Sequence, residues 1–576
     1  MKNYQTEYER WLESAELTEE ERAELLSIGE SEELKELRFS SPMSFGTAGL
    51  RSTMYMGIAC MNRFTVAATT RGIAELVKQN GGESRGVAIG YDSRNNSRLF
   101  ARVSASVLAG AGIRVYIFDD IRPTPELSFA VRETGSIAGI NITASHNPKE
   151  YNGYKAYWED GAQLSPENAS LVQEAMANYD VLDTSGLMDF DKGVADGIIT
   201  VLGEDFDEIY LDRVVKTSVN PEALRELGDS LKVVYTPLHG AGRRLVPEAF
   251  RRAGLEKLYT VESQMTPDGN FPTVKKPNPE YKEVFEDGIA LADKVGADLI
   301  IATDPDSDRV GVMARNSEGV FETITGNQMG ALLLDYVITE RRRLGKLPRH
   351  AFAVKSIVST DMAYKIAETN GVVLHDVLTG FKYIGETIKD YEARGLEDGF
   401  VLGFEESYGY LLGTYARDKD AVEASLIILE MTAFYAKRGM TLKGALDDLF
   451  RRYGYYREAV HDVYMEGLSG IAKRKAVMDR LAAEPPRSIA GFDVRKIADY
   501  KECTVYDLLT GNKESTGQPS SEVFSYTLTS GDKVIIRPSG TEPKIKIYVL
   551  ANAKSEKELA IKCEALLRDA VKLTEI

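Results

Sequence analysis

The sequence predicts an α/β protein of several domains, with a smaller α+β domain at its C-terminal end. At 576 residues the chain is too long for a single hydrophobic core, and its length suggests about four domains. Short apolar strands alternate with amphipathic helices through three successive blocks, a pattern typical of sheets covered by helices on both faces. The last block, from about Tyr455, instead places its strands between two helices.

The composition excludes some classes of protein. A hydrophobic content of 43% and a charged content of 27% are ordinary for a globular protein. The net charge of −18 argues against a nucleic-acid-binding protein, which normally carries a basic face. It does not exclude a phosphorylated small-molecule substrate, because a basic pocket can lie inside an acidic protein.

The cysteines and the N-terminus favour a reducing, cytoplasmic location. Cys60, Cys503 and Cys563 are few, odd in number and far apart, so neither a disulfide framework nor a thiolate metal site is indicated. The N-terminus has no apolar leader segment, and no run of about eighteen apolar residues predicts a membrane span. No feature of these residues predicts the oligomeric state.

The first predicted domain covers residues 1–205. It opens with acidic residues 4–38, which we interpret as a helical surface extension. Strands are predicted at 86–91, 113–118 and 137–143, and helices at 65–79, 99–111 and 125–133. In such sheets the binding sites lie beyond the carboxyl ends of the strands. Asp92-Ser93-Arg94 and Ser145 both stand at that position.

Three further domains are predicted, at residues 206–322, 323–450 and 451–576. The first has strands at 231–235, 258–261 and 297–302. The second has strands at 351–355, 372–375 and 400–403, with helices at 327–344, 361–370 and 422–437. The last has strands at 525–529, 533–536 and 544–550, with helices at 470–483 and 556–572.

The turn Thr143-Ala144-Ser145-His146-Asn147-Pro148 exposes a hydroxyl at the end of a strand. Such a mount suits a serine that carries a phosphoryl group, because a serine oxygen is a poor nucleophile without a base, a metal or a phosphoryl group already attached. The alternative is a plain polar turn. We do not expect a Ser145–His146 couple, because neighbouring side chains of an extended chain point to opposite faces.

Three aspartates, Asp304, Asp306 and Asp308, alternate directly after the strand at 297–302. They bring hard oxygen ligands together, which suits Mg²⁺ or Ca²⁺. An EF-hand is excluded, since Arg309 stands where its loop needs glycine. Carboxylates this close repel one another unless a cation compensates them, so we favour a metal site over a solvated acidic loop.

Three other loops have the composition of anion or sugar sites. Residues 44–51 place two glycines before Arg51, residues 537–544 combine Arg, Ser, Gly, Thr and Lys, and Glu405, Ser407 and Lys419 follow a strand. The first two can cradle an anion, and the third can bind sugar hydroxyls and a phosphate. Each can equally be a turn or a charged loop, with Asp420 as a helix cap.

The order of these loops resembles the α-D-phosphohexomutase family, which includes phosphoglucomutases and phosphomannomutases. The similarity runs from Ser44 to Tyr548, and its most specific parts are 143–148 and 304–309. It implies three similar α/β domains with mixed sheets and a smaller C-terminal α+β domain around a central active-site cleft. It also implies a phosphosugar mutase that interconverts glucose 1-phosphate and glucose 6-phosphate.

The resemblance also implies roles for individual residues. Ser145 matches the phosphoserine, whose phosphate joins Asp304, Asp306 and Asp308 around one Mg²⁺, and Lys155 matches the active-site lysine. Glucose 1,6-bisphosphate is the implied intermediate and activator. The substrate-binding positions of the family are matched by Arg51, Arg309, Lys382, Glu405, Ser407, Lys419, Arg537, Ser539, Gly540 and Thr541.

Some positions depart from commoner family patterns. Ala48, Pro305 and Ser307 replace Ser, Gly and Gly, and Lys382 stands where dual-specificity mutases have His. The N-terminal helix and Tyr408-Gly409-Tyr410 point to the branch of bacterial α-phosphoglucomutases and phosphopentomutase-like relatives. Phosphopentomutase, phosphomannomutase and sugar-bisphosphate synthase therefore remain alternatives.

The expected mechanism starts and ends each turnover with phosphorylated Ser145. Lys155, His146 and Lys382 are candidate general acid/base groups. Lys155 is favoured, on the expectation that crowded cations lower its pKa. Two alternatives lie outside this class. A metal-dependent sugar phosphatase would release inorganic phosphate, and a sugar-phosphate sensor would need no phosphorylatable serine.

Overall fold

The computed structural model describes residues 3–46, 49–465, 467–539 and 544–575. Its chain forms two compact units. One contains Met1–Thr323, Ile388–Glu397 and Gly409–Arg438, and the other contains Ile324–Thr387, Asp398–Tyr408 and Gly439–Ile576.

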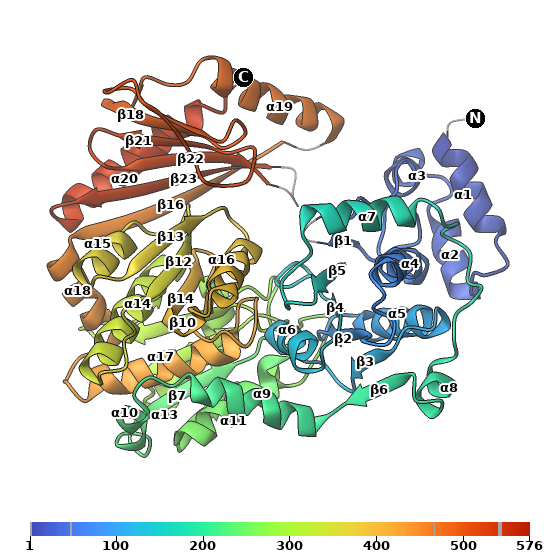
Figure 1. The fold of residues 1–576 in the computed structure, drawn as a ribbon, viewed down its shortest axis with the longest axis horizontal. Coiled ribbons are helices and arrows are strands. Elements are labelled where there is room, and N and C mark those ends of the chain that lie inside the picture. The colour runs from blue at the N-terminus through green and yellow to red at the C-terminus, as the bar shows by residue number, and fades with distance from the viewer. Residues whose placement is uncertain (1–2, 47–48, 466, 540–543, 576) are drawn as a thin grey trace. The chain divides into compact units, whose positions relative to one another are not determined.

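The N-terminal extension consists of three helices, α1 (Asn3–Glu13), α2 (Glu19–Ser27) and α3 (Glu32–Phe39). Trp11 is fully buried, with its ring centroid 5.8 Å from that of Phe39 and 5.5 Å from that of Phe64. Phe64 belongs to α4 (Arg63–Gln79), and Figure 1 shows the three blue helices beside α4. The extension is therefore packed onto the first domain by its own aromatic core.

The first sheet of this unit has the strand order β1-β5-β4-β2-β3-β6. Strands β2, β3, β4 and β6 run parallel, and β5 and β1 are antiparallel additions at one edge. Every residue of β2 and β4 is buried, as expected where helices cover both faces. The strands are β1 (Leu50–Thr53), β2 (Val87–Tyr91), β3 (Val115–Phe118), β4 (Ala138–Ile142), β5 (Tyr151–Trp158) and β6 (Ile199–Leu202). The helices after α4 are α5 (Ser97–Gly110), α6 (Thr124–Glu133), α7 (Pro166–Met176), α8 (Phe190–Ala195) and α9 (Glu204–Lys216).

The second sheet of the same unit has the order β11-β10-β9-β7-β8. Strand β7 is parallel to both β8 and β9, and β10 is antiparallel to β9. The strands are β7 (Lys232–Thr236), β8 (Lys257–Thr260), β9 (Leu299–Thr303), β10 (Val310–Arg315) and β11 (Phe321–Ile324). The helices are α10 (Pro221–Arg225), α11 (Gly242–Ala253), α12 (Glu262–Met265), a short 3₁₀ helix (Lys282–Phe285) and α13 (Glu286–Val295). The unit also contains β15 (Gly409–Leu411) and α17 (Ala421–Ala436).

The second unit begins with a third α/β sheet, in which β12 (Phe352–Ser356) lies parallel between β13 (Val373–Val377) and β14 (Phe400–Glu405). Gly330 allows close packing of α14 on this sheet, because a Cβ there would lie 2.4 Å from the Phe404 ring. The helices are α14 (Gly326–Arg343), α15 (Met362–Thr369), α16 (Phe381–Ala393), which ends in the first unit, a 3₁₀ turn (Glu397–Gly399) and α18 (Leu442–Tyr453).

The C-terminal domain is an antiparallel sheet of order β16-β23-β22-β21-β18-β19-β20, with β17 paired to β18. Three of its strands were predicted. The others, β16 among them, were missed because their exposure does not alternate regularly. The strands are β16 (Tyr455–Tyr464), β17 (Ser488–Ile489), β18 (Phe492–Asp499), β19 (Thr504–Asp507), β20 (Lys513–Ser515), β21 (Phe524–Leu528), β22 (Lys533–Pro538) and β23 (Lys544–Ala553). The helices are α19 (Gly467–Ala483) and α20 (Glu556–Lys572).

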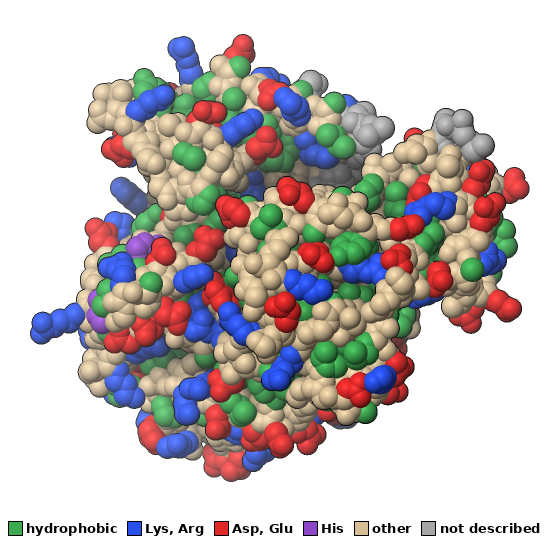
Figure 2. Space-filling view, turned by 45° about the vertical axis from the view of Figure 1, so that its right-hand side comes forward, with side chains coloured by type: hydrophobic (Ala, Val, Ile, Leu, Met, Phe, Trp, Pro, Cys, Tyr) green, Lys and Arg blue, Asp and Glu red, His purple; other side chains and the backbone are tan. Residues whose placement is uncertain are grey.

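This architecture confirms the predicted fold class, three α/β domains followed by a β-rich C-terminal domain. The predicted domain limits stay predictions. Among the described residues, no helix is long and apolar enough to cross a membrane. Figure 2 shows acidic and basic side chains interspersed over the visible face, as expected for a protein of mixed charge with an acidic excess.

Helix α17 begins with a buried acidic pair, Asp420 and Glu423. The alternative interpretation of Asp420 as a helix cap is confirmed, because its side chain accepts a hydrogen bond of 2.9 Å from Glu423 N. Burial, and then repulsion from Asp420, raises the pKa of Glu423 from 4.5 to about 8. The folded state therefore holds a proton that the unfolded chain releases, and Glu423 lowers stability progressively as pH rises from about 4.5 to about 8.

We therefore expect Glu423→Gln to unfold at a higher temperature than the wild type at pH 8, with a smaller difference at pH 5. Glutamine keeps an acceptor for Leu412 N and removes the titration. Thermal unfolding at both pH values checks this, with the exposed Glu36→Gln as the control. A melting-temperature difference that does not change with pH would contradict it.

Candidate active site

Ser145 lies in the turn that follows β4, at the carboxyl edge of the first sheet. Its main-chain φ is +51°, and only 3% of the residue is exposed. Its N–H donates to Thr143 Oγ1 (2.8 Å), and its Oγ donates to Asp304 Oδ2 (2.8 Å). Since Asp304 follows β9 of the second sheet, two strand ends from different domains meet at this hydroxyl.

The predicted absence of a Ser145–His146 couple is wrong. Ser145 Oγ and His146 Nδ1 are 3.1 Å apart, within hydrogen-bond distance. The prediction assumed an extended chain, but the left-handed conformation of Ser145 places both side chains on the same side of the turn. Burial, and then the positive charges of Arg309 and Arg51, holds the pKa of His146 well below its usual value.

The three predicted metal ligands are buried together. Asp304, Asp306 and Asp308 each offer a carboxylate oxygen, and these oxygens lie within 4.8 Å of one another. Asp306 Oδ1 and Asp308 Oδ1 are buried and accept no hydrogen bond. Buried carboxylate oxygens normally have partners, so this donor set fits a hard divalent cation such as Mg²⁺.

Two lysines compensate part of the acidic charge. Lys155 Nζ lies 2.8 Å from Asp306 Oδ2 and 3.1 Å from Asp308 Oδ2, and Lys419 Nζ lies 3.3 Å from Asp308 Oδ2. Burial raises the pKa of all three aspartates. Lys155 outweighs it at Asp306, and Lys155, Lys419 and Arg309 outweigh it at Asp308, so both groups have a pKa below the usual value. Asp304, repelled by its two neighbours, has a pKa well above it.

The expected lowering of the Lys155 pKa is not found. Burial does lower it, but the negative charges of Asp306 and Asp308 outweigh burial and leave the pKa above its usual value. The prediction counted the cations around Lys155 and omitted the acidic neighbours. Lys155 is therefore a fixed positive charge. It is better suited to stabilise a phosphoryl group electrostatically than to act as a general base.

Sequence reasoning missed two residues that hold these groups in place. Thr124, at the start of α6, donates to Asp306 Oδ2 (2.9 Å) and accepts from Asn141 Nδ2 (2.6 Å). Asp418 accepts from Lys419 Nζ (3.0 Å) and from Tyr157 (2.9 Å). The only signal available for Thr124 in the sequence was its position shortly after the end of β3. That position is weak evidence for a role of a single threonine.

Arg51 and Arg309 lie near the same turn. Arg51 Nη1 donates to Asn147 Oδ1 (2.9 Å). Arg309 Nη1 donates to Glu280 Oε1 (2.5 Å), and its Nε lies 3.9 Å from Asp308 Oδ1. Two of the three predicted substrate-binding arginines are thus in the first unit, together with Ser145, the three aspartates and the two lysines.

The other predicted substrate-binding residues belong to the second unit. Glu405, at the end of β14, accepts a hydrogen bond of 2.7 Å from Gly380 N, and Lys382 Nζ lies 4.7 Å from the centroid of the Tyr383 ring. Ser407 is half-buried in the turn after β14. Arg537 ends β22, and Ser539 N donates to Lys544 O (2.9 Å). Gly540 and Thr541 lie outside the described residues.

The geometry of the first unit defines a chemistry. A serine hydroxyl points at a carboxylate triad that suits a divalent cation, beside fixed lysine charges and a histidine. This combination is typical of phosphoryl transfer, in which positioning and charge stabilisation supply most of the catalysis.

Known proteins show the same combination of domains. Models of the phosphoglucomutase/phosphomannomutase α/β/α domains I, II and III match residues 42–182, 208–319 and 325–453.

A phosphoglucomutase of Staphylococcus saprophyticus is 36% identical to this chain over 536 residues, covering 93% of this chain and 95% of that one. The chain belongs to the phosphoglucomutase/phosphomannomutase family. A phosphoglucomutase of Staphylococcus aureus strain MRSA252 is 37% identical over 534 residues, with coverages of 92% and 93%. The predicted phosphohexomutase resemblance is therefore confirmed, and the protein is a phosphosugar mutase, an isomerase.

Solved structures show the same fold at lower identity. The pp63/parafusin phosphoglucomutase from Paramecium, in its open form, matches with a TM-score of 0.66 at 16% identity, over 93% of this chain and 96% of that one. A phosphoglucomutase/phosphomannomutase family protein from Burkholderia thailandensis matches with a TM-score of 0.65 at 18% identity, with coverages of 92% and 97%. The roles of the individual site residues stay predictions.

Proposed function

We propose that this mutase interconverts glucose 1-phosphate and glucose 6-phosphate through phosphorylated Ser145, with glucose 1,6-bisphosphate as the intermediate. The observation that carries the proposal is the 2.8 Å contact between Ser145 Oγ and Asp304 in the carboxylate triad. The choice of glucose is supported by the phosphoglucomutase names of the staphylococcal relatives. We also propose that the enzyme acts in the cytoplasm on a small phosphosugar.

In the proposed transfer, the bond between phosphorus and the Ser145 oxygen breaks as a sugar hydroxyl forms a new bond to the same phosphorus. The hydroxyl gives up its proton to a base of the site, and the Ser145 oxygen takes up a proton as it leaves. That oxygen is then phosphorylated again by the other end of the bisphosphate. His146 Nδ1, 3.1 Å from Ser145 Oγ, is proposed to exchange a proton with that oxygen. Lys155 neutralises charge on the transferred phosphoryl oxygens.

Asp304, Asp306 and Asp308, with a phosphate oxygen on Ser145, would hold one Mg²⁺ ion. When bound, the ion supplies charge stabilisation at the phosphoryl oxygens. The unpartnered oxygens of Asp306 and Asp308 support this assignment. In the second unit, Glu405 and Ser407 are proposed to bind sugar hydroxyls. Lys382, Arg537, Ser539, Gly540 and Thr541 are proposed to bind the substrate and its distal phosphate.

The test is the conversion of glucose 1-phosphate to glucose 6-phosphate, with and without Mg²⁺ and a trace of glucose 1,6-bisphosphate. Turnover that requires Mg²⁺ and rises with the bisphosphate is expected. Mannose 1-phosphate and ribose 1-phosphate, assayed in parallel, separate the phosphomannomutase and phosphopentomutase alternatives. Release of inorganic phosphate in step with substrate loss would overturn the proposal and identify a phosphatase.

A further inference from the structure

Arg94 is a buried side chain whose contacts enclose the Ser145 turn. Only 3% of Arg94 is exposed. Its guanidinium donates to the carbonyl oxygens of Ser145 (2.5 Å), Pro148 (2.9 Å) and Tyr151 (3.1 Å), and also to that of Asn147. A guanidinium carries five N–H donors in a fixed plane, so one side chain ties the loop at four points.

These contacts form a closed ring around the Ser145 peptide. Thr143 Oγ1 accepts from Ser145 N (2.8 Å) and donates to Asp92 Oδ2 (2.7 Å). Asp92 Oδ2 lies 3.3 Å from Arg94 Nε, and Arg94 returns to the Ser145 carbonyl. Both side chains of the Asp92–Arg94 pair are fully buried. The Ser145 peptide is therefore held on its N–H side by Thr143 and on its carbonyl side by Arg94.

This closed ring of contacts through Thr143, Asp92 and Arg94 explains how Ser145 keeps its unusual main-chain conformation. A φ of +51° is disfavoured for any residue with a Cβ atom, and it persists only where the surroundings over-determine it. The same conformation sets Ser145 Oγ 2.8 Å from Asp304 and 3.1 Å from His146 Nδ1. Release of the Ser145 carbonyl would therefore change where the hydroxyl points.

A turn of the second α/β domain covers the other face of Arg94. The Phe271 ring centroid lies 5.1 Å from Arg94 Cζ, and Asn95 Nδ2 donates to Asn270 Oδ1 (3.2 Å). Gly269 permits this approach, because a Cβ there would lie 2.3 Å from Asn95 N. The face of the Phe271 ring attracts the positive charge of the guanidinium, which offsets part of the cost of burying it. Arg94 and its neighbour Asn95 thus link the Ser145 turn to the domain that supplies the three aspartates.

We propose that Arg94 is a positioning residue for phosphoryl transfer, which acts by fixing the Ser145 turn in its left-handed conformation. The inference rests on the proposed function of Ser145. Arg94 touches neither the sugar nor the reacting phosphorus in this account. Its loss should therefore lower kcat through misplacement of the hydroxyl and leave substrate binding almost unchanged.

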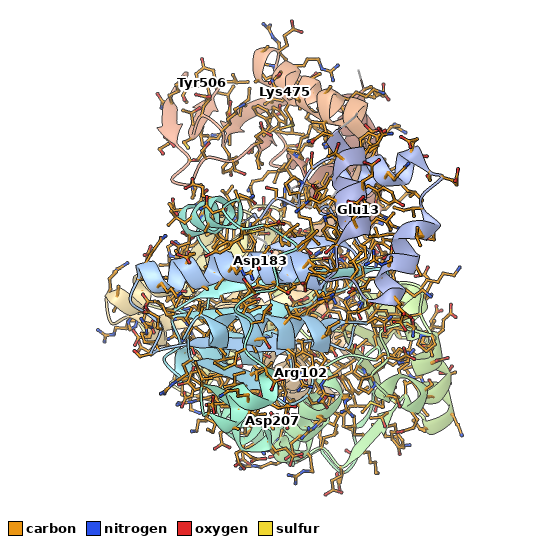
Figure 3. The ribbon with its side chains drawn as sticks, turned by 90° about the vertical axis from the view of Figure 1, so that its right-hand side faces the viewer. Glu13, Arg102, Asp183, Asp207, Lys475 and Tyr506 are labelled. Atoms are coloured by element: carbon orange, nitrogen blue, oxygen red, sulfur yellow. The ribbon has the colours of Figure 1, made fainter. Side chains whose placement is uncertain are left out.

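The test compares Arg94→Lys with Arg71→Lys, a matched control. Arg71 is also buried, donates to the Ser185 carbonyl (2.8 Å) and pairs with Asp183, which is labelled in Figure 3, so that both of these partners lie outside residues 143–151. Both variants should lose thermal stability. Arg94→Lys alone should lower kcat about 100-fold with KM within about threefold of wild type, and its amides at 143–151 should exchange faster with deuterium.

Phe271→Leu is a second variant that keeps the guanidinium and removes only its aromatic cover. It should lower kcat by a smaller factor, with the same faster exchange at 143–151. The inference is overturned if Arg94→Lys keeps kcat within about twofold of Arg71→Lys, or if its 143–151 amides exchange as in the wild type. Absence of mutase turnover in the wild type would instead refute the proposed function. Hydrogen exchange would still report whether Arg94 holds the 143–151 segment.

Discussion

Ser145→Ala is expected to lower mutase turnover by at least about 10³-fold while the protein remains folded, because no other group can take its place as the phosphoryl carrier. Its Oγ is the atom that meets Asp304 at 2.8 Å, and it lies beside His146 in a buried turn. Substitution removes this atom and leaves the main-chain bonds to Thr143 and Arg94 available. Initial rates with glucose 1-phosphate and circular dichroism of the same samples check both parts.

Ser104→Ala is the matched control for this substitution. Ser104 is also a fully buried serine of the first unit, and its hydroxyl donates to Phe100 O in α5 and accepts from Thr70 Oγ1 in α4. Its loss should change stability slightly and leave kcat near the wild-type value. Near-normal turnover in Ser145→Ala would refute the phosphoserine mechanism. An equal loss in both variants would attribute the effect to folding instead.

Asp306→Asn is expected to lower Mg²⁺-dependent turnover by about 10²- to 10³-fold. The substitution removes one negative charge from the triad and replaces one carboxylate oxygen by an amide nitrogen, which cannot bind a cation. Asp306 Oδ2 also accepts from Lys155 and Thr124, so the lysine loses part of its anchor. Chelation of the wild type followed by titration with Mg²⁺ should restore activity, and the variant should need far more Mg²⁺ and recover less.

Asp335→Asn provides the control for removal of a buried carboxylate. Asp335 belongs to the second unit, is 2% exposed, and accepts from Arg452 and Tyr453. Its substitution should reduce the free energy of unfolding by about 1–3 kcal/mol, because it weakens hydrogen bonds to a buried carboxylate whose partner Arg452 is itself exposed, without a change in the Mg²⁺ dependence of kcat. If Asp306→Asn responded to Mg²⁺ as the wild type does, the metal assignment would be wrong.

The sequence predicted the main strands and both strand-end loops because their signals are local. Strand β4 is an apolar run that stops at a polar turn, and β9 is one that stops at Asp304. Three aspartates at alternate positions can be recognised without a structure, because they share one short loop. Strand β5, which carries Lys155, was missed because its only apolar residues are aromatic ones and Ala156, mixed with polar residues.

The features that the sequence did not predict depend on contacts between distant segments. The Ser145–His146 contact follows from a positive φ, and that conformation is held by Arg94, which lies 51 residues away in the chain. The Lys155 pKa depends on Asp306, 151 residues away. Neither effect is encoded in the residues next to it, so only the folded chain brings the deciding charges and hydrogen bonds together.

In the proposed mechanism Ser145 carries the phosphoryl group between the two sugar positions. The most direct measurement is mass spectrometry of the purified enzyme after incubation with glucose 1,6-bisphosphate and Mg²⁺. A phosphate-sized mass increment is expected on the peptide that contains Ser145. It should disappear when excess glucose 6-phosphate is added, as the phosphoryl group is transferred to form glucose 1,6-bisphosphate. Active enzyme in which Ser145 never gains the increment, or which releases it as inorganic phosphate, would contradict the account.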